Sequence, residues 1–243
     1  MSSKDSIEML SAGLVPEKYL RNIGTIGIDG QLRLLKARVA VIGAGGLGGN
    51  VIELLARQGV GHIRVIDGDV FAPHNLNRQL LATESNLGVN KALAAADRIA
   101  EVNSDVHVEA VSKMLDAENA LELLAEVDVV IDALDNISCR LLVSKTARQL
   151  GIPLVHGAIA GFTGQVTTLL PQDAGLESIY KVTAGSDKGI ETALGNPAAT
   201  PAFAAAIQVQ EVIKVLTGVG EILRQRLLYF DTELNIFELL DIR

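Results

Sequence analysis

The sequence is poor in cysteine and in positive charge. Cys139 is the single cysteine among 243 residues, which excludes an internal disulfide and any metal site built from paired cysteine thiolates. Asp and Glu outnumber Lys and Arg by 29 to 21, giving a formal net charge of −8. Because nucleic-acid binding relies on many Lys and Arg contacts to phosphates, we expect no nucleic-acid partner. Any basic site must be local.

Long apolar runs are also missing. No stretch reaches the roughly 18 residues that a membrane span needs, and the first ten residues, "MSSKDSIEML", mix charges of both signs with short apolar runs. We therefore expect a cytoplasmic protein with no membrane partner. With 49% hydrophobic residues, the chain can bury one substantial core, so we expect a single domain over residues 1–243.

Apolar runs typical of strands alternate with segments of helical periodicity, a pattern typical of βαβ units. The expected strands are "RVAVIG" (38–43), "HIRVID" (62–67), "VHVEAV" (106–111), "VDVVIDA" (127–133) and "PLVHGAI" (153–159). The expected helices span 46–58, 89–102, 117–125 and 137–150. This alternation predicts an α/β fold with a doubly wound, Rossmann-like and mostly parallel sheet.

The alternation of strands and helices ends after Gly161. "GQVTTLL" follows the fifth strand too closely for a crossover helix, so we expect an antiparallel strand there. An alanine-rich helix ending near "VIKVLTG" and a hairpin of "RLLYFD" and "NIFELLDI" follow. We divide the chain into an N-terminal helical arm (1–36), a nucleotide-binding part (37–160) and a C-terminal part (161–243) with a crossover loop at about 171–196.

A glycine turn follows the first expected strand. In "GAGGLG", Gly43, Gly45 and Gly48 have the G-x-G-x-x-G spacing, which lets a phosphate approach a helix amino terminus. Asp67 stands 19 residues beyond Gly48, at the end of the second strand, where a carboxylate can accept ribose hydroxyls. Asp69 follows as a further candidate. The motif predicts a nucleotide site, although glycines used only for tight packing would give the same spacing.

The polar stretch "HNLNRQ" (74–79) distinguishes between nucleotides. A nicotinamide cofactor needs no cluster of donors beyond the second strand, whereas a triphosphate extends further and carries more charge. Arg78 as a bidentate donor, with Asn75 and Gln79 as neutral donors, suits the outer phosphates. Lys91 lies in the first turn of the next helix and can reach the same phosphates. Solvated surface charge is the alternative for both basic residues.

"VDVVIDALDN" ends in Asp135 and Asn136 at the same edge of the predicted sheet. A carboxylate beside a triphosphate would be repelled unless a divalent cation lay between them, so Asp135 is the predicted Mg²⁺ ligand. Asn136 is a candidate cofactor-binding residue. Helix capping is the structural alternative for this pair, and Asn136 suits that role.

Taken together, these residues resemble the ThiF/MoeB/HesA adenylyltransferases, relatives of the ubiquitin-activating enzymes. The resemblance runs from about residue 18 to 218, through "YLRN", "GQLRLLKARVAVIGAGGLGG", "IDGDVFAPHNLNRQ", "GVNKA", "ALDN" and "GAIAGFTGQVT". It implies that Gly46 joins the other three glycines at the nucleotide site, and that Asp67 holds the ribose. It implies phosphate-binding roles for Asn75, Arg78, Gln79 and Lys91, and magnesium binding by Asp135.

The resemblance also implies the reaction and the assembly. The reaction is ATP- and Mg²⁺-dependent adenylation of the C-terminal glycine of a small ubiquitin-like sulfur-carrier protein ending in Gly-Gly, in thiamine- or molybdopterin-type cofactor synthesis. Arg21 matches an arginine that one subunit of a homodimer supplies to the other subunit's outer phosphates. No residue has to act as a nucleophile.

The sequence departs from the common family pattern in its cysteines. Family members usually carry two Cys-x-x-Cys pairs that bind a structural zinc, whereas the corresponding regions here read "LESIYKV" and "FELLDIR". We therefore expect no zinc. Some members use a cysteine in the crossover loop for a covalent link with the partner, and 171–196 contains none. Cys139 is interpreted as a small buried residue.

Other functions remain open at this point. An NAD-dependent oxidoreductase would leave Arg78, Lys91 and Asp135 without a shared role. A non-catalytic relative that binds nucleotide or partner fits the missing cysteines, and a relative acting on transfer RNA conflicts with the acidic balance.

The crossover loop at 171–196 contains several glycines. With Gly175, Gly185, Gly189 and Gly195 and few large apolar residues, it should bury little and be mobile, and we interpret it as a lid that shields the acyl-adenylate from water. A surface loop without a role is the alternative.

Overall fold

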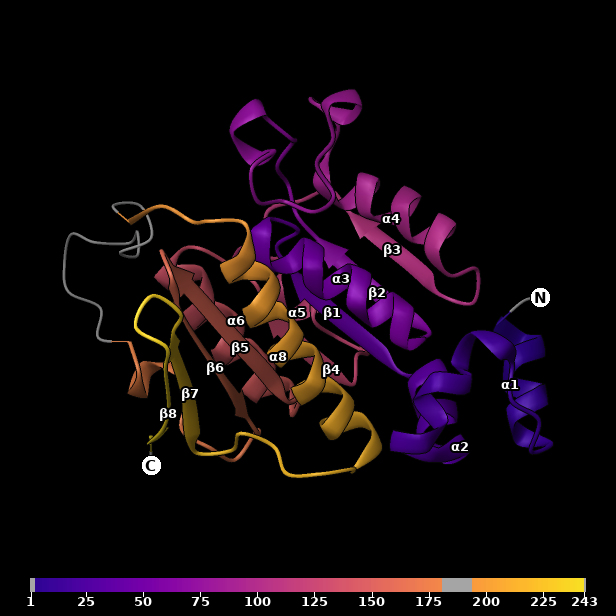
Figure 1. The fold of residues 1–243 in the computed structure, drawn as a ribbon. Helices are drawn as coiled ribbons and strands as arrows, with labels where there is room; N and C mark the ends of the chain where they lie inside the picture. Colours follow the sequence, from indigo (N-terminus) through magenta and orange to yellow (C-terminus); the bar gives the residue numbers. More distant parts are fainter. Residues whose placement is uncertain (1–2, 181–193, 243) are drawn as a thin grey trace.

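Eight strands form one sheet in the computed structural model, which describes residues 3–180 and 194–242. Their order across the sheet is β3-β2-β1-β4-β5-β6-β7-β8 (Figure 1). The strands are β1 (Arg38–Ile42), β2 (His62–Ile66), β3 (His107–Val111), β4 (Val129–Asp132), β5 (Leu154–Ala160), β6 (Thr163–Leu169), β7 (Arg226–Asp231) and β8 (Ile236–Asp241).

The first five strands run parallel. β1 lies between β2 and β4, with Val41 opposite Val65 on one side and Ile131 on the other. The chain therefore winds in one direction from β1 to β3 and in the other from β4 to β5, which confirms the predicted doubly wound sheet. In such sheets a crevice opens between the carboxyl ends of the two central strands, here β1 and β4.

The last three strands are antiparallel, as predicted. Only two residues, Gly161 and Phe162, separate β5 from β6, so the chain must reverse directly. Gly161 has a positive φ of 57°, which suits this tight turn. β7 pairs with β6, and β8 pairs with β7 as a hairpin at the sheet edge.

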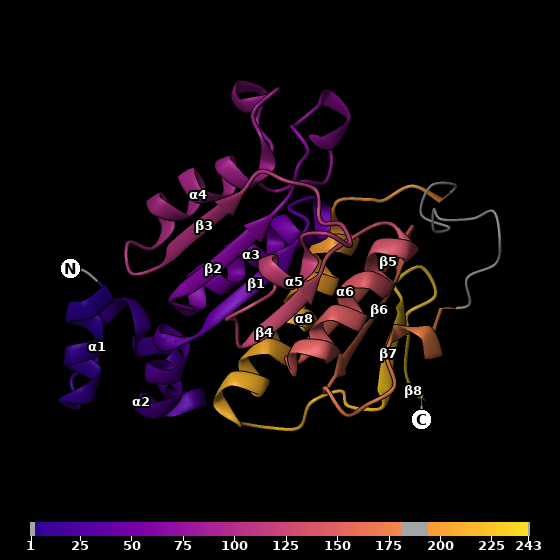
Figure 2. The same cartoon turned by 180° about the vertical axis from the view of Figure 1, so that it is seen from behind.

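Helices cover both faces of the sheet (Figures 1 and 2). Two separate clusters of buried apolar side chains form the core, a larger one under α3, α4 and α8 and a smaller one under α5 and α6. The covering helices are α3 (Gly46–Gln58), α4 (Lys91–Val102), α5 (Ala120–Leu123), α6 (Ile137–Leu150) and α8 (Ala199–Thr217). Short 3₁₀ turns lie at η2 (Pro73–Asn75), η3 (Glu84–Asn86) and η4 (Leu176–Ser178).

The N-terminal arm is helical and has a small core of its own. It consists of α1 (Ser3–Ser11), the turn η1 (Glu17–Tyr19) and α2 (Leu20–Lys36), which is kinked where Gly27 has a φ of 69°. Leu10, Tyr19 and Leu35 are buried together. The Leu34 carbonyl accepts the Gly61 amide just before β2, so the arm lies at the amino ends of the strands (Figure 1).

Residues 171–180 of the crossover segment are packed more tightly than the sequence predicts. Leu176 is fully buried in the smaller core, and Arg224 forms a bidentate ion pair with Asp173. The prediction that this segment buries little is therefore wrong for residues 171–180, because "LESIY" supplies apolar side chains that reach α6. The rest of the predicted lid, residues 181–193, lies outside the described residues.

Among the described residues, no helix combines enough length and apolar character to cross a bilayer.

Candidate functional site

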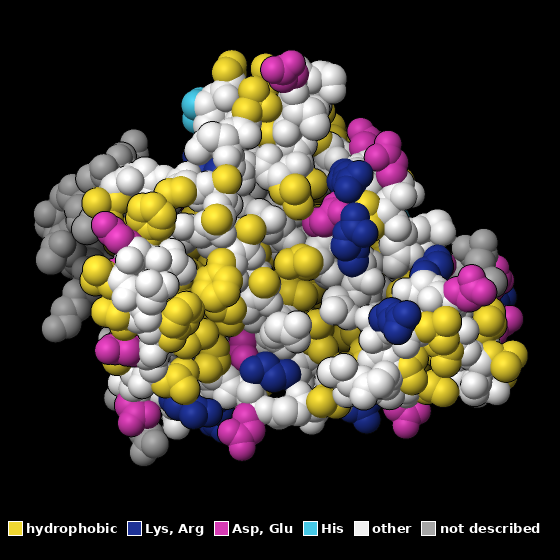
Figure 3. All heavy atoms as spheres, in the orientation of Figure 1, with side chains coloured by type: hydrophobic (Ala, Val, Ile, Leu, Met, Phe, Trp, Pro, Cys, Tyr) yellow, Lys and Arg dark blue, Asp and Glu magenta, His cyan; other side chains and the backbone are white. Residues whose placement is uncertain are grey.

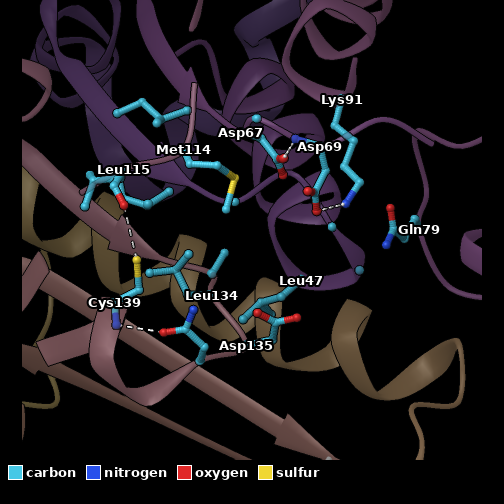
Figure 4. Close-up of a pocket in the computed structure, with 18 of the residues that line it drawn as sticks. Leu47, Asp67, Asp69, Gln79, Lys91, Met114, Leu115, Leu134, Asp135 and Cys139 are labelled. Carbon is cyan, nitrogen blue, oxygen red and sulfur yellow. Dashed lines mark hydrogen bonds and ion pairs between the residues drawn. The ribbon is translucent and has the colours of Figure 1, made fainter. Parts of the chain in front are cut away.

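A pocket opens at the carboxyl ends of β1, β2 and β4, at the predicted crevice (Figure 4). Asp67, Asp69 and Lys91 lie on one side, and Asp135 and Cys139 lie on the other. Of the predicted site residues, the pocket brings together Gly43, Gly45, Gly46, Asp67, Asp69, Arg78, Gln79, Lys91, Asp135 and Asn136. Gly48, Asn75 and Arg21 do not line it.

The glycine turn is shaped by close backbone packing. Gly43 has a φ of 94°, and its amide donates to the Ile66 carbonyl at 2.9 Å, which ties the turn to β2. A Cβ on Gly48 would lie 1.8 Å from the Gly43 carbonyl oxygen. Gly48 therefore keeps the start of α3 close to β1, while Gly45 and Gly46 form the pocket wall. The amino end of α3 thus faces the pocket, an arrangement that binds phosphates.

Asp67 is fixed at the end of β2. One carboxylate oxygen accepts the Ala44 amide at 2.7 Å, and the other accepts the Asp69 amide at 2.8 Å. Burial raises the pKa of Asp67, although both hydrogen bonds oppose the shift. Each carboxylate oxygen has capacity for a second hydrogen bond, so this side chain can accept hydroxyl donors from a ribose.

Lys91 is a buried cation with a neighbouring counterion. It is the first residue of α4, whose N-cap Asn90 accepts the Ala92 and Leu93 amides. The Lys91 side chain is 9% exposed, and its Nζ lies 2.9 Å from Asp69 Oδ2 (Figure 4). Asp69 therefore orients the ammonium at the pocket wall, where it can attract an anionic ligand.

Some residues of the "HNLNRQ" stretch line the pocket, and others hold the conformation of its loop. Asn75 is buried, and its Oδ1 accepts the Ala72 amide at 2.9 Å, which closes the 3₁₀ turn η2. Arg78 lines the pocket and donates to the His74 carbonyl and to Asn77 Oδ1. Gln79 is 6% exposed, and its Oε1 has no partner among the described atoms. Asn75 thus shapes the loop that presents Arg78 and Gln79.

Asp135 and Asn136 have separate roles. Asn136 caps α6 by accepting the Cys139 amide at 2.8 Å, which leaves the exposed Asp135 out of the cap. Within residues 3–180 and 194–242, no group of three His, Cys, Asp or Glu side chains could hold a metal ion. A single carboxylate nevertheless suits Mg²⁺ in a nucleotide site, because that ion is commonly held by one or two carboxylates together with substrate phosphates.

Further residues line the pocket that were not predicted from the sequence. Lys113 and Met114 follow β3, and Arg140 lies in the first turns of α6. The strand-end rule that selected Asp67 and Asp135 would also have indicated Lys113, because β3 ends at the same edge. Arg140 had no comparable signal. Cys139 was expected to be a buried residue, but it is half-buried and lines the pocket.

Arg21 lies far from the pocket of its own chain. It is exposed at the start of α2, and the adjacent Asn22 donates to the Gln58 carbonyl at the carboxyl end of α3. The pocket lies at the amino end of α3, and a helix of 13 residues is about 20 Å long. Arg21 therefore cannot join its own pocket in this arrangement.

The fold and the pocket define an α/β protein with a nucleotide-type site at a topological switch point. The model of the ThiF family matches residues 19–243, and this chain belongs to that family.

Several related proteins align over most of the chain. It is 40% identical over 225 residues to the SAMP-activating enzyme E1 of Haloferax volcanii, covering 91% of this chain and 83% of that protein. It is 38% identical over 233 residues to the sulfur carrier protein adenylyltransferase of Thermus thermophilus, covering 90% and 83%. It is 38% identical to the adenylyltransferase and sulfurtransferase MOCS3 of Culex quinquefasciatus, of which it spans 52%.

Solved structures show the same fold. The chain superposes on E. coli MccB with ATP with a TM-score of 0.82 at 22% identity, covering 93% of this chain and 72% of that one. At this identity the likeness concerns the fold alone.

Proposed function

We propose that this protein is an adenylyltransferase that uses ATP and Mg²⁺ to activate the C-terminal glycine of a small ubiquitin-like sulfur-carrier protein. The observation that carries the proposal is the convergence of the glycine turn, Asp67, Arg78, Lys91 and Asp135 on one pocket in a ThiF-family chain. Relatives named for sulfur-carrier adenylation and SAMP activation support it.

The pocket supplies what this reaction requires. A carrier carboxylate oxygen attacks the α-phosphorus of ATP, the bond from that phosphorus to the bridging oxygen breaks, and pyrophosphate leaves with the bond electrons. Both reactants are anionic, so positive charge must offset their repulsion. Lys91 and Arg78 provide fixed charge, Asp67 orients the ribose, and Asp135 would hold Mg²⁺, which neutralises phosphate charge when bound. Alignment of the carrier tail then accelerates the attack.

A protein substrate suits the molecular surface. Large apolar side chains are exposed on β8 and at the start of α8, among them Phe203 (40% exposed), Phe237 (57%) and Leu239 (54%) (Figure 3). Exposed apolar patches of this kind mark protein interaction sites. The position of Arg21 supports a homodimer. Arg21 cannot reach the pocket of its own subunit, but in a dimer it could reach the pocket of the partner subunit.

Isotope exchange between pyrophosphate and ATP tests the proposed function. We expect exchange that requires both Mg²⁺ and a carrier ending in Gly-Gly, and that is abolished when the carrier's last glycine is replaced by a bulky residue. An oxidoreductase or a non-catalytic binding module gives no exchange with any carrier. Full exchange with the bulky tail would contradict the substrate class.

A further inference from the structure

A hydrogen-bonded network of buried and half-buried polar side chains reaches the pocket wall at Arg140 and has no role in the reaction described above. His156 Nδ1 lies 2.7 Å from Asp132 Oδ2, and His156 Nε2 lies 2.9 Å from the Tyr180 hydroxyl. That hydroxyl accepts from Arg140 Nη1 at 2.8 Å and from Gln165 Nε2 at 2.7 Å. These contacts join β4, β5, β6 and α6 to Tyr180, which lies two residues beyond η4.

The protonation states of His156 and Asp132 determine which group donates each hydrogen bond in the network. Burial lowers the pKa of His156, and the Arg140 charge lowers it further against the opposing effect of Asp132. Burial alone would raise the pKa of Asp132, but the His156 hydrogen bond and the Arg140 charge outweigh it and lower the pKa. Asp132 is therefore ionised and His156 is neutral near pH 7. It follows that Tyr180 donates to His156, and His156 donates to Asp132.

The hydrogen-bonded network ends at Leu134, the residue before Asp135. Asp132 Oδ1 accepts the Leu134 amide at 3.0 Å, and Arg140 Nη2 donates to the Leu134 carbonyl. Both backbone polar groups of Leu134 are thus held by buried charged side chains of the network. Asp132 is 0% exposed and Arg140 is 6% exposed, so water competes little for these bonds. Because Leu134 directly precedes Asp135, these bonds fix the backbone that carries the exposed Asp135 side chain.

From this geometry we infer that Tyr180, His156, Asp132 and Arg140 are positioning residues that hold Asp135 where it can bind the magnesium of Mg·ATP. The inference rests on the proposed function for the role of Asp135. We expect the Tyr180 hydroxyl, 45 residues beyond Asp135 in the sequence, to affect metal-dependent nucleotide binding without contacting the ligand. A purely structural network would stabilise the fold and leave that binding unchanged.

A double-mutant cycle on nucleotide binding separates these roles. Calorimetry would measure the Kd of ATP, with saturating Mg²⁺ and with EDTA, for the wild type, Tyr180→Phe, Asp135→Asn and the double variant. Tyr180→Phe removes one hydroxyl from a half-buried ring, so the fold should persist, and His156→Gln is a second network variant. Tyr229→Phe is the matched control, because Tyr229 is also half-buried, on β7 outside the network.

We expect Mg²⁺ to tighten ATP binding in the wild type and in Tyr229→Phe. Tyr180→Phe, His156→Gln and Asp135→Asn should each lose about tenfold of that tightening, the scale of one hydrogen bond to a charged group. The metal-free Kd should stay unchanged in the two network variants and should fall in Asp135→Asn, because that substitution removes a carboxylate that repels the phosphates. The double variant should lose no more than Asp135→Asn. Full metal dependence in folded Tyr180→Phe and His156→Gln, or losses that multiply in the double variant, would overturn the inference.

The two proposals fail in different ways. Absence of carrier-dependent pyrophosphate exchange in the wild type would count against the proposed function. The binding cycle needs no carrier and no turnover, so it decides the positioning role independently of that result.

Discussion

Asp135 is the residue whose surroundings bear most on the chemistry. Its neighbour Asn136 caps α6, so the fold does not need the Asp135 carboxylate for that purpose. We predict that Asp135→Ala keeps the wild-type melting temperature and lowers exchange at least about 100-fold, the scale of one preorganised electrostatic group. Asn136→Ala is the informative comparison, because it should lower the melting temperature through loss of the cap. Wild-type exchange by folded Asp135→Ala would remove this residue from the mechanism.

His156 makes stability depend on pH. Its pKa is lowered in the folded state, so between that value and the unfolded value of about 6.5 the unfolded chain binds more protons. The contribution of His156 is therefore fully present above about pH 6.5 and is lost as the pH falls. We predict that the free energy of unfolding falls between pH 7 and pH 5.5, and that this slope is shallower in His156→Gln. Chemical denaturation at each pH measures it.

The control for this experiment is the exposed His74. His74→Gln should keep the wild-type slope. An equal slope in wild type and His156→Gln would show that His156 titrates alike in both states.

Individual site residues were predictable where the chain places them at strand ends. Asp67 directly follows β2 and Asp135 lies three residues beyond the end of β4, so the strand pattern alone predicts that they lie at the same edge of the sheet. The buried network could not be predicted in this way. Its hydrogen bonds join residues 24 and 40 positions apart, and Tyr180 comes from an irregular segment with no periodicity to interpret.

At the scale of elements, the β1–α3 turn is the most constrained. A Cβ on Gly48 would overlap the Gly43 carbonyl oxygen, and neither backbone can move without shifting β1 against α3. We predict that Gly48→Ala lowers the free energy of unfolding by about 2 kcal/mol or more. Gly24→Ala is the control, because Gly24 is exposed on α2 with no atom near its Cβ position, and it should stabilise by up to about 1 kcal/mol. Equal effects, measured by denaturant unfolding, would contradict the packing role.

Strands and long helices were predicted well because their periodicity is local. All five parallel strands occur within two residues of their predicted ends, and 46–58 and 137–150 are helices with the predicted bounds. The helix predicted for 117–125 shortens to α5, because Asp116 and Asn119 form a turn just before it. The contacts of Leu176 were missed because a buried loop residue gives no periodic signal.

At the scale of the whole molecule, the position of Arg21 predicts a shared active site. We expect Arg21→Ala and Arg78→Ala homodimers to be nearly inactive, whereas mixed dimers contain one intact pocket and recover activity. Exchange rates after mixing and reassembly measure this. Mixed dimers as inactive as both parents would contradict a shared active site.

The scarcity of cysteine leads to a prediction about metal content. With one cysteine in the chain, the paired thiolates of a structural zinc site cannot form. We predict that elemental analysis of purified protein finds no stoichiometric zinc. One zinc per chain would contradict this.

We propose that the pocket joins AMP to the carrier's terminal carboxylate. Intact-mass spectrometry of the carrier, after single turnover with Mg·ATP and pyrophosphatase, tests it most directly. We expect the wild type to form a carrier heavier by one adenylyl group, and Asp135→Ala to form none. An unmodified carrier, under conditions where the wild type binds Mg·ATP and carrier together, would contradict it.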